Sequence, residues 1–147
     1  QALFRQPYVC LMRTGHPLAS GSQLRLQDFT AAEHVRVLAA GTGHGRVDAA
    51  LARHGVHRRV RLTVPHYVAL GDVLGHSDLL ATVPERFAQR VLTPFGLTLR
   101  PLPVEVEDSA IHQFWHGRLH RDPGHQWLRL QIAALFGDRL QTDEAPA

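Results

Sequence analysis

Short apolar runs along the chain alternate with segments in which apolar residues recur every three or four positions. The runs predict strands, because Val, Leu and Ile favour a buried, extended backbone, and the periodic segments predict helices. The predicted strands cover residues 8–12, 34–38, 60–64, 78–83, 97–102 and 111–116. The predicted helices cover residues 24–29, 47–54, 70–74, 84–92 and 123–136.

Local signals mark several of the helix ends. Gly55 stands where a C-terminal cap belongs, and a glycine adopts the left-handed backbone of such a cap without strain. Pro84 is expected at the first helical position, where its missing N–H costs nothing. Asp122 fits an N-cap. The last helix carries an apolar stripe that is expected to be buried, formed by Leu128, Ile132 and Leu135.

Strands that alternate with helices favour an α/β fold with a largely parallel sheet. In such sheets, ligands bind outside the carboxyl ends of the strands. Three strand-to-helix junctions follow one another in this chain, at residues 41–45, 65–67 and 82–85. Each junction directs backbone amides of a helix N-terminus toward a common crevice, which attracts anions.

These junctions also carry polar side chains. His44 and His66 lie on two of them, and Thr42, Tyr67 and Thr82 add hydroxyl donors. We interpret the set as a pocket for a small anionic or aromatic molecule. Each feature alone has an ordinary explanation, because a glycine-rich turn or a loop histidine is common without any ligand.

Composition limits the alternatives. All 16 basic residues are Arg, the net charge is only +3, and the Arg residues are interleaved with acids. A nucleic-acid surface would need clustered positive charge, so none is expected on this chain itself. The single cysteine, Cys10, excludes an internal disulfide and is expected to be a buried structural thiol in a reducing compartment such as the cytoplasm. No apolar run approaches the length of a membrane span, and the first eleven residues do not resemble a signal peptide.

The sequence gives little support for a metal site, a cofactor or an enzymatic activity. His112, His116 and His120 have a spacing of four, but the first two fall on a predicted strand and no cysteine or carboxylate completes a site. No nucleophile elbow and no phosphate-binding glycine loop occurs. The acidic residues have structural explanations, either in a solvated connection (Glu105, Glu107 and Asp108) or in first helical turns (Asp48 and Glu85).

Several motifs in fixed order resemble the effector-binding (substrate-binding) domain of LysR-type transcriptional regulators, in the branch that contains regulators of nodulation and of aromatic-compound catabolism. The resemblance runs from Tyr8 to Phe136. It rests on residues 16–19, 26–29, 43–48, 59–67, 77–86, 114–116 and 122–129.

The resemblance implies two Rossmann-like lobes of the periplasmic-binding-protein type (type II), with the second lobe complete and the first partial. It implies these boundaries: residues 1–33 end the first lobe and cross over, 34–101 form the second lobe, 102–137 return to the first, and 138–147 are a tail. Residues 8–12 would then belong to the first lobe.

The resemblance also implies an effector between the lobes, a small-molecule inducer such as an aromatic carboxylate. The implied contact residues are Thr42, His44, Pro65, His66, Tyr67, Thr82 and, less strongly, Phe114. Tyr67 stands where this branch is expected to have Phe. DNA would be bound only through an N-terminal domain that this sequence lacks, in a homo-oligomer (dimer or tetramer), without a membrane or a cofactor.

Three alternatives remain open. A solute-binding protein of the transport type would share the fold, and a small α/β enzyme could use His44 or His66 as a base. The chain could also bind no ligand and serve only in assembly.

Overall fold

The structure, a computed structural model, describes residues 1–38 and 44–137 and divides the chain into two units. Unit 1 joins Gln1–Gln6 to the part of the chain that begins at Ser109, and unit 2 comprises Pro7–Asp108. Residues 8–12 belong to the sheet of unit 2, and the lobe boundaries that the resemblance implies stay a prediction. The backbone hydrogen bonds of residues 8–12 run to strands of that unit on both sides.

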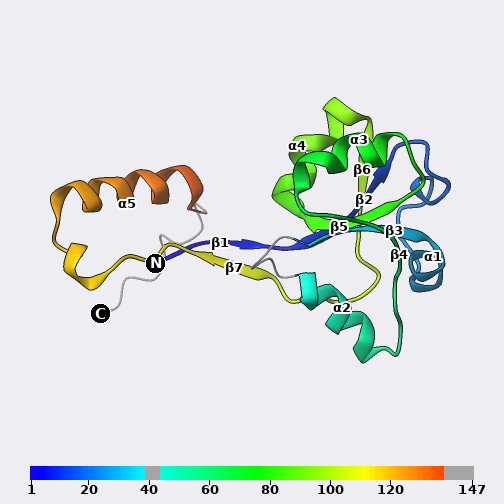
Figure 1. Cartoon of the computed structure of the whole chain (residues 1–147), viewed down its shortest axis with the longest axis horizontal. Helices are drawn as coiled ribbons and strands as arrows, with labels where there is room; N and C mark the ends of the chain where they lie inside the picture. Colours follow the sequence, from blue (N-terminus) through cyan, green and yellow to red (C-terminus); the bar gives the residue numbers. More distant parts are fainter. Residues whose placement is uncertain (39–43, 138–147) are drawn as a thin grey trace. The chain divides into compact units, whose positions relative to one another are not determined.

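Unit 2 is built on a five-stranded sheet with the order β4-β3-β5-β2-β6 (Figure 1). The strands are β2 (Tyr8–Arg13), β3 (Glu33–Val37), β4 (Arg59–Val64), β5 (Leu80–Pro84) and β6 (Leu97–Pro101). β3 pairs in parallel with β4 and β5, whereas β2 is antiparallel to both β5 and β6. The expectation of a largely parallel sheet is therefore wrong, and the sheet is mixed. The antiparallel strand β2 enters between two strands that come much later in the chain.

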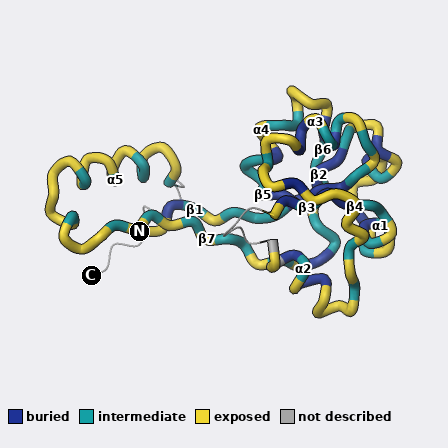
Figure 2. The backbone as a smooth tube through the Cα atoms, viewed as in Figure 1, coloured by how far each residue is buried: buried dark blue, intermediate teal, exposed yellow. Residues whose placement is uncertain are grey.

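Helices cover both faces of this sheet (Figure 1). The first face packs against α3 (Leu70–Gly75) and α4 (Glu85–Phe95), and the second against α1 (Leu26–Ala31) and α2 (His44–Arg53). Short 3-10 turns, η1 (Pro17–Ala19) and η2 (Tyr67–Ala69), complete the unit. Figure 2 shows the most deeply buried backbone along the central strands, between these helices.

The position of strand β2 in the middle of the unit explains why its residues form a continuous apolar run in the sequence. Val9 and Leu11 contribute to the core on the first face, and Cys10 and Met12 contribute to the core on the second. A strand buried on both faces reads as a continuous apolar run. Cys10 is fully buried, as predicted, and burial raises the pKa of its thiol to about 12.

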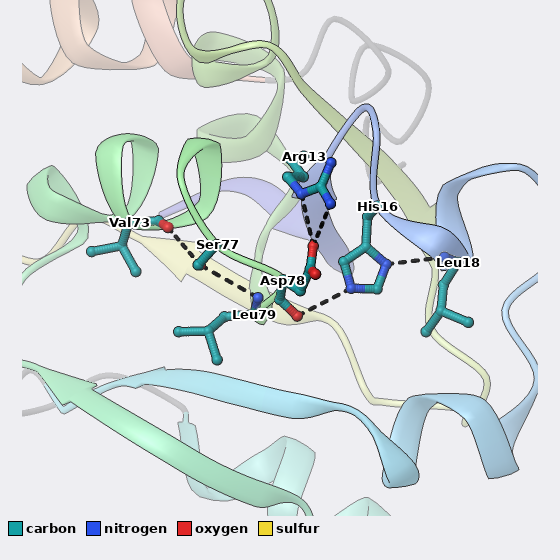
Figure 3. Close-up of polar contacts among 7 residues, drawn as sticks. All are labelled: Arg13, His16, Leu18, Val73, Ser77, Asp78 and Leu79. Atoms are coloured by element: carbon teal, nitrogen blue, oxygen red, sulfur yellow. Dashed lines mark hydrogen bonds and ion pairs between the residues drawn. The ribbon is translucent and has the colours of Figure 1, made fainter.

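A polar network joins two loops at the end of the sheet where β2 finishes (Figure 3). The Arg13 guanidinium binds the Asp78 carboxylate with N–O distances of 2.6 and 2.7 Å. Nδ1 of His16 accepts from the backbone N–H of Leu18 at 3.0 Å, so Nε2 is the donor to the Asp78 carbonyl at 3.1 Å. His16 is buried in this arrangement, and its two ring nitrogens hold the two loops together.

Helix ends follow the predicted signals with two differences. Gly55 and Gly96 have φ values of 69° and 61°, as left-handed caps require. Pro84 is the N-cap of α4 and not its first residue. Asp48 lies beyond the first turn of α2, where it binds Arg58 through Oδ1 at 2.6 and 2.9 Å.

Unit 1 contains a two-stranded antiparallel sheet, a 3-10 turn and a helix. The elements are β1 (Ala2–Gln6), β7 (Ser109–His112), η3 (Gly117–Leu119) and α5 (Pro123–Phe136). The sequence pattern did not predict β1, and the strand predicted to reach residue 116 ends at His112, because its partner strand ends at Ala2. The Asp122 carboxylate caps α5 by accepting from the His125 N–H at 2.8 Å, as predicted.

The apolar stripe expected on α5 is not buried. No described residue of α5 is buried, and the exposed fraction reaches 75% at Leu135. The described part of unit 1 offers α5 only the β1–β7 pair, which can cover one side of a helix. Large apolar side chains therefore stay exposed, namely Trp127, Leu128, Leu130, Leu135 and Phe136.

Candidate functional site

The three parallel strands of unit 2 end at one edge of the sheet. Val37 at the end of β3 is paired with Val64 at the end of β4, and the Leu38 N–H donates to the Val64 carbonyl at 2.9 Å. On the other side, Val35 is paired with Ala81 of β5. The junctions that follow β4 and β5 therefore leave the sheet at the same edge, which is the edge where parallel sheets bind ligands.

Thr82 is a buried polar residue at this edge. Only 6% of its surface is exposed, and no described group forms a hydrogen bond with its hydroxyl oxygen. It is paired with Cys10 of β2 and lies on the second face of the sheet, the face of α1 and α2. Buried hydroxyl groups nearly always find a partner, so Thr82 is an exception among the described residues, and its role in a site stays a prediction.

Arg36 lies beside Thr82 and was not among the predicted site residues. Its Nε atom is buried and has no partner among the described residues. The sequence pattern predicted residues 34–38 as one alternating strand and did not single out Arg36. That signal is a charged residue between two valines in a strand that has neighbours on both sides.

Pro65 and His66 are exposed directly after β4. His66 is the N-cap residue of η2, with an extended backbone and no capping hydrogen bond from its side chain. Its imidazole is therefore not committed to the helix end.

Tyr67, unlike exposed Pro65 and His66, packs into the core of unit 2. Its ring packs on that of Phe87 of α4, with the two ring centroids 5.0 Å apart, and it contributes to the core of the first face. Burial, and secondarily the hydroxyl of Tyr8, raises the Tyr67 pKa to about 12. The phenol is therefore neutral, and core packing fixes the ring.

The structure does not bring the other predicted contact residues together with Pro65, His66 and Thr82. Thr42 and the junction 41–43 lie outside the described residues, as does the side chain of His44, whose backbone begins α2. Phe114 belongs to unit 1, where 88% of its surface is exposed. Their contribution to a site stays a prediction.

His34 is the buried histidine of unit 2 nearest this edge. Its Nε2 lies 2.6 Å from the Phe29 carbonyl, to which it donates, and the two rings meet edge to face at 4.6 Å. Its Nδ1 is buried without a described partner. Burial is the largest influence and lowers the His34 pKa to about 4, so this side chain adds no positive charge to the site.

Two surface grooves of unit 2 lie along the segment that leaves β6. One, of about 640 Å³, lies between residues 23–26 and 101–105, and the other, of about 360 Å³, lies between residues 7–9 and 99–106. No predicted contact residue lines either groove. The first groove is thus separate from the edge described above, whereas the second is also lined by Glu85 of the junction that follows β5.

Two histidines of unit 1 have separate hydrogen-bond partners. His116 accepts from the Arg118 N–H at 3.1 Å, and His120 accepts from the Trp115 indole at 3.3 Å. Within residues 1–38 and 44–137, no three His, Cys, Asp or Glu side chains gather as a metal ion would require. None of the helices described combines the length and apolar character needed to cross a membrane.

Comparison with known proteins identifies the family. The sequence pattern of the LysR substrate binding domain matches residues 1–137. This chain belongs to the LysR substrate-binding domain family. Membership confirms the resemblance and the α/β fold of the type II periplasmic-binding-protein class.

Individual relatives are also transcriptional regulators by name. The chain is 51% identical over 136 residues to the HTH-type transcriptional activator NagR of Ralstonia sp and 47% identical to NahR of Pseudomonas putida. Nodulation protein D 2 of Rhizobium tropici is 27% identical over 140 residues. Each match covers 92% of this chain but only 44–45% of the relative. The LysR domain of this chain thus spans just under half the length of these curated relatives.

Solved structures share the fold. The regulatory domain of MexT, a transcriptional activator in Pseudomonas aeruginosa, matches with a TM-score of 0.80 and 34% identity, over 92% of this chain and 66% of that one. The effector binding domain of QuiR in complex with shikimate matches with a TM-score of 0.62 and 14% identity, over 92% of this chain and 65% of that one. The second likeness supports the fold alone.

Proposed function

We propose that this chain is the effector-sensing part of a LysR-type transcriptional regulator and that it binds a small anionic or aromatic inducer. The observation that carries the proposal is the common edge of β3, β4 and β5 in a chain of this family. Exposed His66 and buried Thr82 lie at that edge. The predicted contacts Thr42, His44 and Phe114 complete the site in this proposal.

The proposed mechanism is a shift between two arrangements of the effector-binding domain. An inducer can cause such a shift only if it binds one arrangement more tightly than the other. The change would reach DNA through the DNA-binding domain of the whole regulator, in the cytoplasm and within a homo-oligomer.

A thermal-shift screen tests the proposal. A panel of aromatic carboxylates, sugars and amino acids is added to the protein, and the unfolding temperature is measured, because a ligand of the native state stabilises it. We expect an aromatic carboxylate to raise the unfolding temperature, and the shift to shrink in His44→Ala and His66→Ala. His57→Ala is the matched control, since His57 is exposed in the loop before β4, away from the edge. Stabilisation by sugars or amino acids alone would favour a transport-type solute-binding protein instead.

We also propose that this chain is not an enzyme. Family membership gives no catalytic role, and the test is direct. Any molecule that stabilises the protein is incubated with it and followed by mass spectrometry. Turnover that disappears in His66→Ala would replace the sensor with an enzyme that uses His66 as a base.

A further inference from the structure

The outer face of α5 in unit 1 carries a regular stripe of uncharged side chains. Its members are exposed and recur at intervals of three and four residues, namely Trp127, Leu130, Gln131, Ala134 and Leu135. This spacing places the side chains on one side of a helix, as in the seam between two packed helices. The exposed fraction is 63% at Trp127, 67% at Leu130 and 75% at Leu135. These five residues are termed the α5 seam.

The opposite side of α5 is the side that packs within unit 1. Four of its residues are half-buried, namely His125, Arg129, Ile132 and Ala133. The helix contacts β1, and the side-chain amide of Gln113, next to β7, donates to the Arg129 carbonyl at 3.2 Å. Unit 1 therefore fixes the orientation of the helix and turns the α5 seam outward.

The α5 seam carries no charge that would oppose a copy of itself. Arg129 is the single Arg, Lys, Asp or Glu of α5, and it lies on the opposite side. Its guanidinium carbon lies 4.3 Å from the centre of the Trp115 ring, and its nitrogens donate to the Leu119 and His120 carbonyls at 3.3 and 3.0 Å. Two antiparallel copies of α5 would also place the positive end of each helix dipole beside the negative end of the other.

The α5 seam also fits a copy of itself in shape. When two copies of α5 lie antiparallel about a two-fold axis near Gln131, the large Trp127 of one copy meets the smaller Ala134 and Leu135 of the second copy. Gln131 near the axis can hydrogen-bond to its equivalent, because an amide both donates and accepts.

The size of the seam sets the strength of the contact. A helix of 14 residues is about 21 Å long and about 10 Å wide. Such a pair buries on the order of 400–500 Å² per copy, about half of what a standard protein–protein interface buries. An uncharged, self-complementary face of this size predicts a weak dimer.

We propose that the α5 seam is the surface through which two copies of this chain associate, as an antiparallel two-fold pair of helices. The proposal is independent of the effector site in unit 2. The competing occupant is a further segment of a longer polypeptide, because the match to the MexT regulatory domain covers only 66% of that domain. The symmetry of size and the lack of charge along the seam favour the second copy.

Sedimentation equilibrium measures the association from about 1 μM to about 1 mM protein, in the wild-type chain, in Leu130→Glu and in Val68→Glu. Val68 is the matched control, because it is an apolar residue of unit 2 with 88% of its surface exposed. We expect a dissociation constant of about 10–100 μM for the wild-type dimer. Leu130→Glu should weaken the dimer at least about 100-fold, since each dimer would bury two new charges, and Val68→Glu should leave it unchanged.

Disulfide formation tests the two-fold arrangement. Gln131→Cys places one thiol on each side of the axis, and helices in contact bring such positions within the Cα–Cα range of a disulfide. The natural thiol of Cys10 is fully buried and does not take part. Under mild oxidation Gln131→Cys should give a covalent dimer on a non-reducing gel. Arg121→Cys, at an exposed position of unit 1 before α5 begins, should stay monomeric on that gel.

Three outcomes would overturn the proposal. A wild-type chain that is monomeric at every concentration leaves the α5 seam to a segment of a longer polypeptide. A dimer that persists in Leu130→Glu shows that another surface joins the copies. Association beyond a dimer, without the Gln131→Cys cross-link, shows that the exposed face adheres without forming a defined helix pair.

Discussion

Acidification is expected to destabilise unit 2 through one buried side chain, His34. Burial lowers its pKa in the folded state from 6.5 to about 4, whereas in the unfolded chain the imidazole is solvated and titrates normally. Between these values the unfolded state binds more protons than the folded state, so stability rises with pH there. The stabilising contribution is complete above about pH 6.5 and is lost as the pH falls toward 4.

The size of the effect follows from the pKa shift. The full shift corresponds to about 3 kcal/mol, and about 2 kcal/mol of it is lost between about pH 8 and about pH 5. No reduction for solvent screening applies, because His34 is fully buried. A loss of this size is a large part of the stability of an ordinary domain.

Urea unfolding followed by far-UV circular dichroism measures this loss. Both tryptophans, Trp115 and Trp127, lie in unit 1, so their fluorescence would not report on His34. His34→Gln keeps a side-chain amide that can donate to the Phe29 carbonyl but removes the titrating group. The wild-type protein should lose about 2 kcal/mol more than His34→Gln over this pH range. The exposed-histidine control His57→Gln should behave as wild type.

Equal losses in the wild-type protein and in His34→Gln would refute the assignment. The imidazole would then be as easily protonated in the folded state as in the unfolded chain, and His34 would not be buried as the structure has it.

Three further predictions concern single side chains. Without ligand, Thr82→Val should raise the free energy of unfolding by about 1 kcal/mol in urea titrations, because it removes a buried hydroxyl that has no partner, and a loss of stability would show that the hydroxyl is bonded. The thiol of Cys10 should resist maleimide until urea unfolds unit 2, and modification of the native protein followed by mass spectrometry would contradict its burial. Asp48→Asn should destabilise the protein by about 1–2 kcal/mol, since Arg58 has only 3% of its side chain exposed, whereas Asp78→Asn at an exposed pair should cost less than about 1 kcal/mol in the same assay.

Local sequence signals predicted the elements of unit 2 well. Strand β2 and the strands around residues 35 and 81 appear as apolar runs because they are buried on at least one face. The strand around residue 62 was also predicted, although Val64 is its only buried residue. Gly55 adopts the expected φ of 69°, since the position of a cap depends on nearby residues only. The family resemblance added the fold class, which periodicity alone left as a generic α/β arrangement.

Strand direction was not predictable in the same way. Whether β2 runs parallel or antiparallel to β5 depends on which strands meet across about 70 residues of chain, and apolar runs carry no such information. The exposed face of α5 has a related cause, because an apolar stripe shows that a helix can be buried but not whether a covering element is present.

The candidate site was predicted in part. His66 stands out because it comes soon after the end of β4, and Thr82 stands out as a polar residue within the apolar strand β5. Arg36 does not, because the feature that distinguishes it is a buried Nε atom that has no described partner and lies on the strand beside Thr82. That property appears only when neighbouring strands are in register, and a single sequence does not give the register.

We propose that the effector binds at the carboxyl edge of β3, β4 and β5. Hydrogen–deuterium exchange of the protein with and without its best-binding acid tests this most directly, because bound ligand slows exchange of nearby amides. The account predicts protection confined chiefly to peptides covering residues 34–38, 64–67 and 80–85. Protection confined to residues 23–26 and 101–106, along the surface groove, would contradict it.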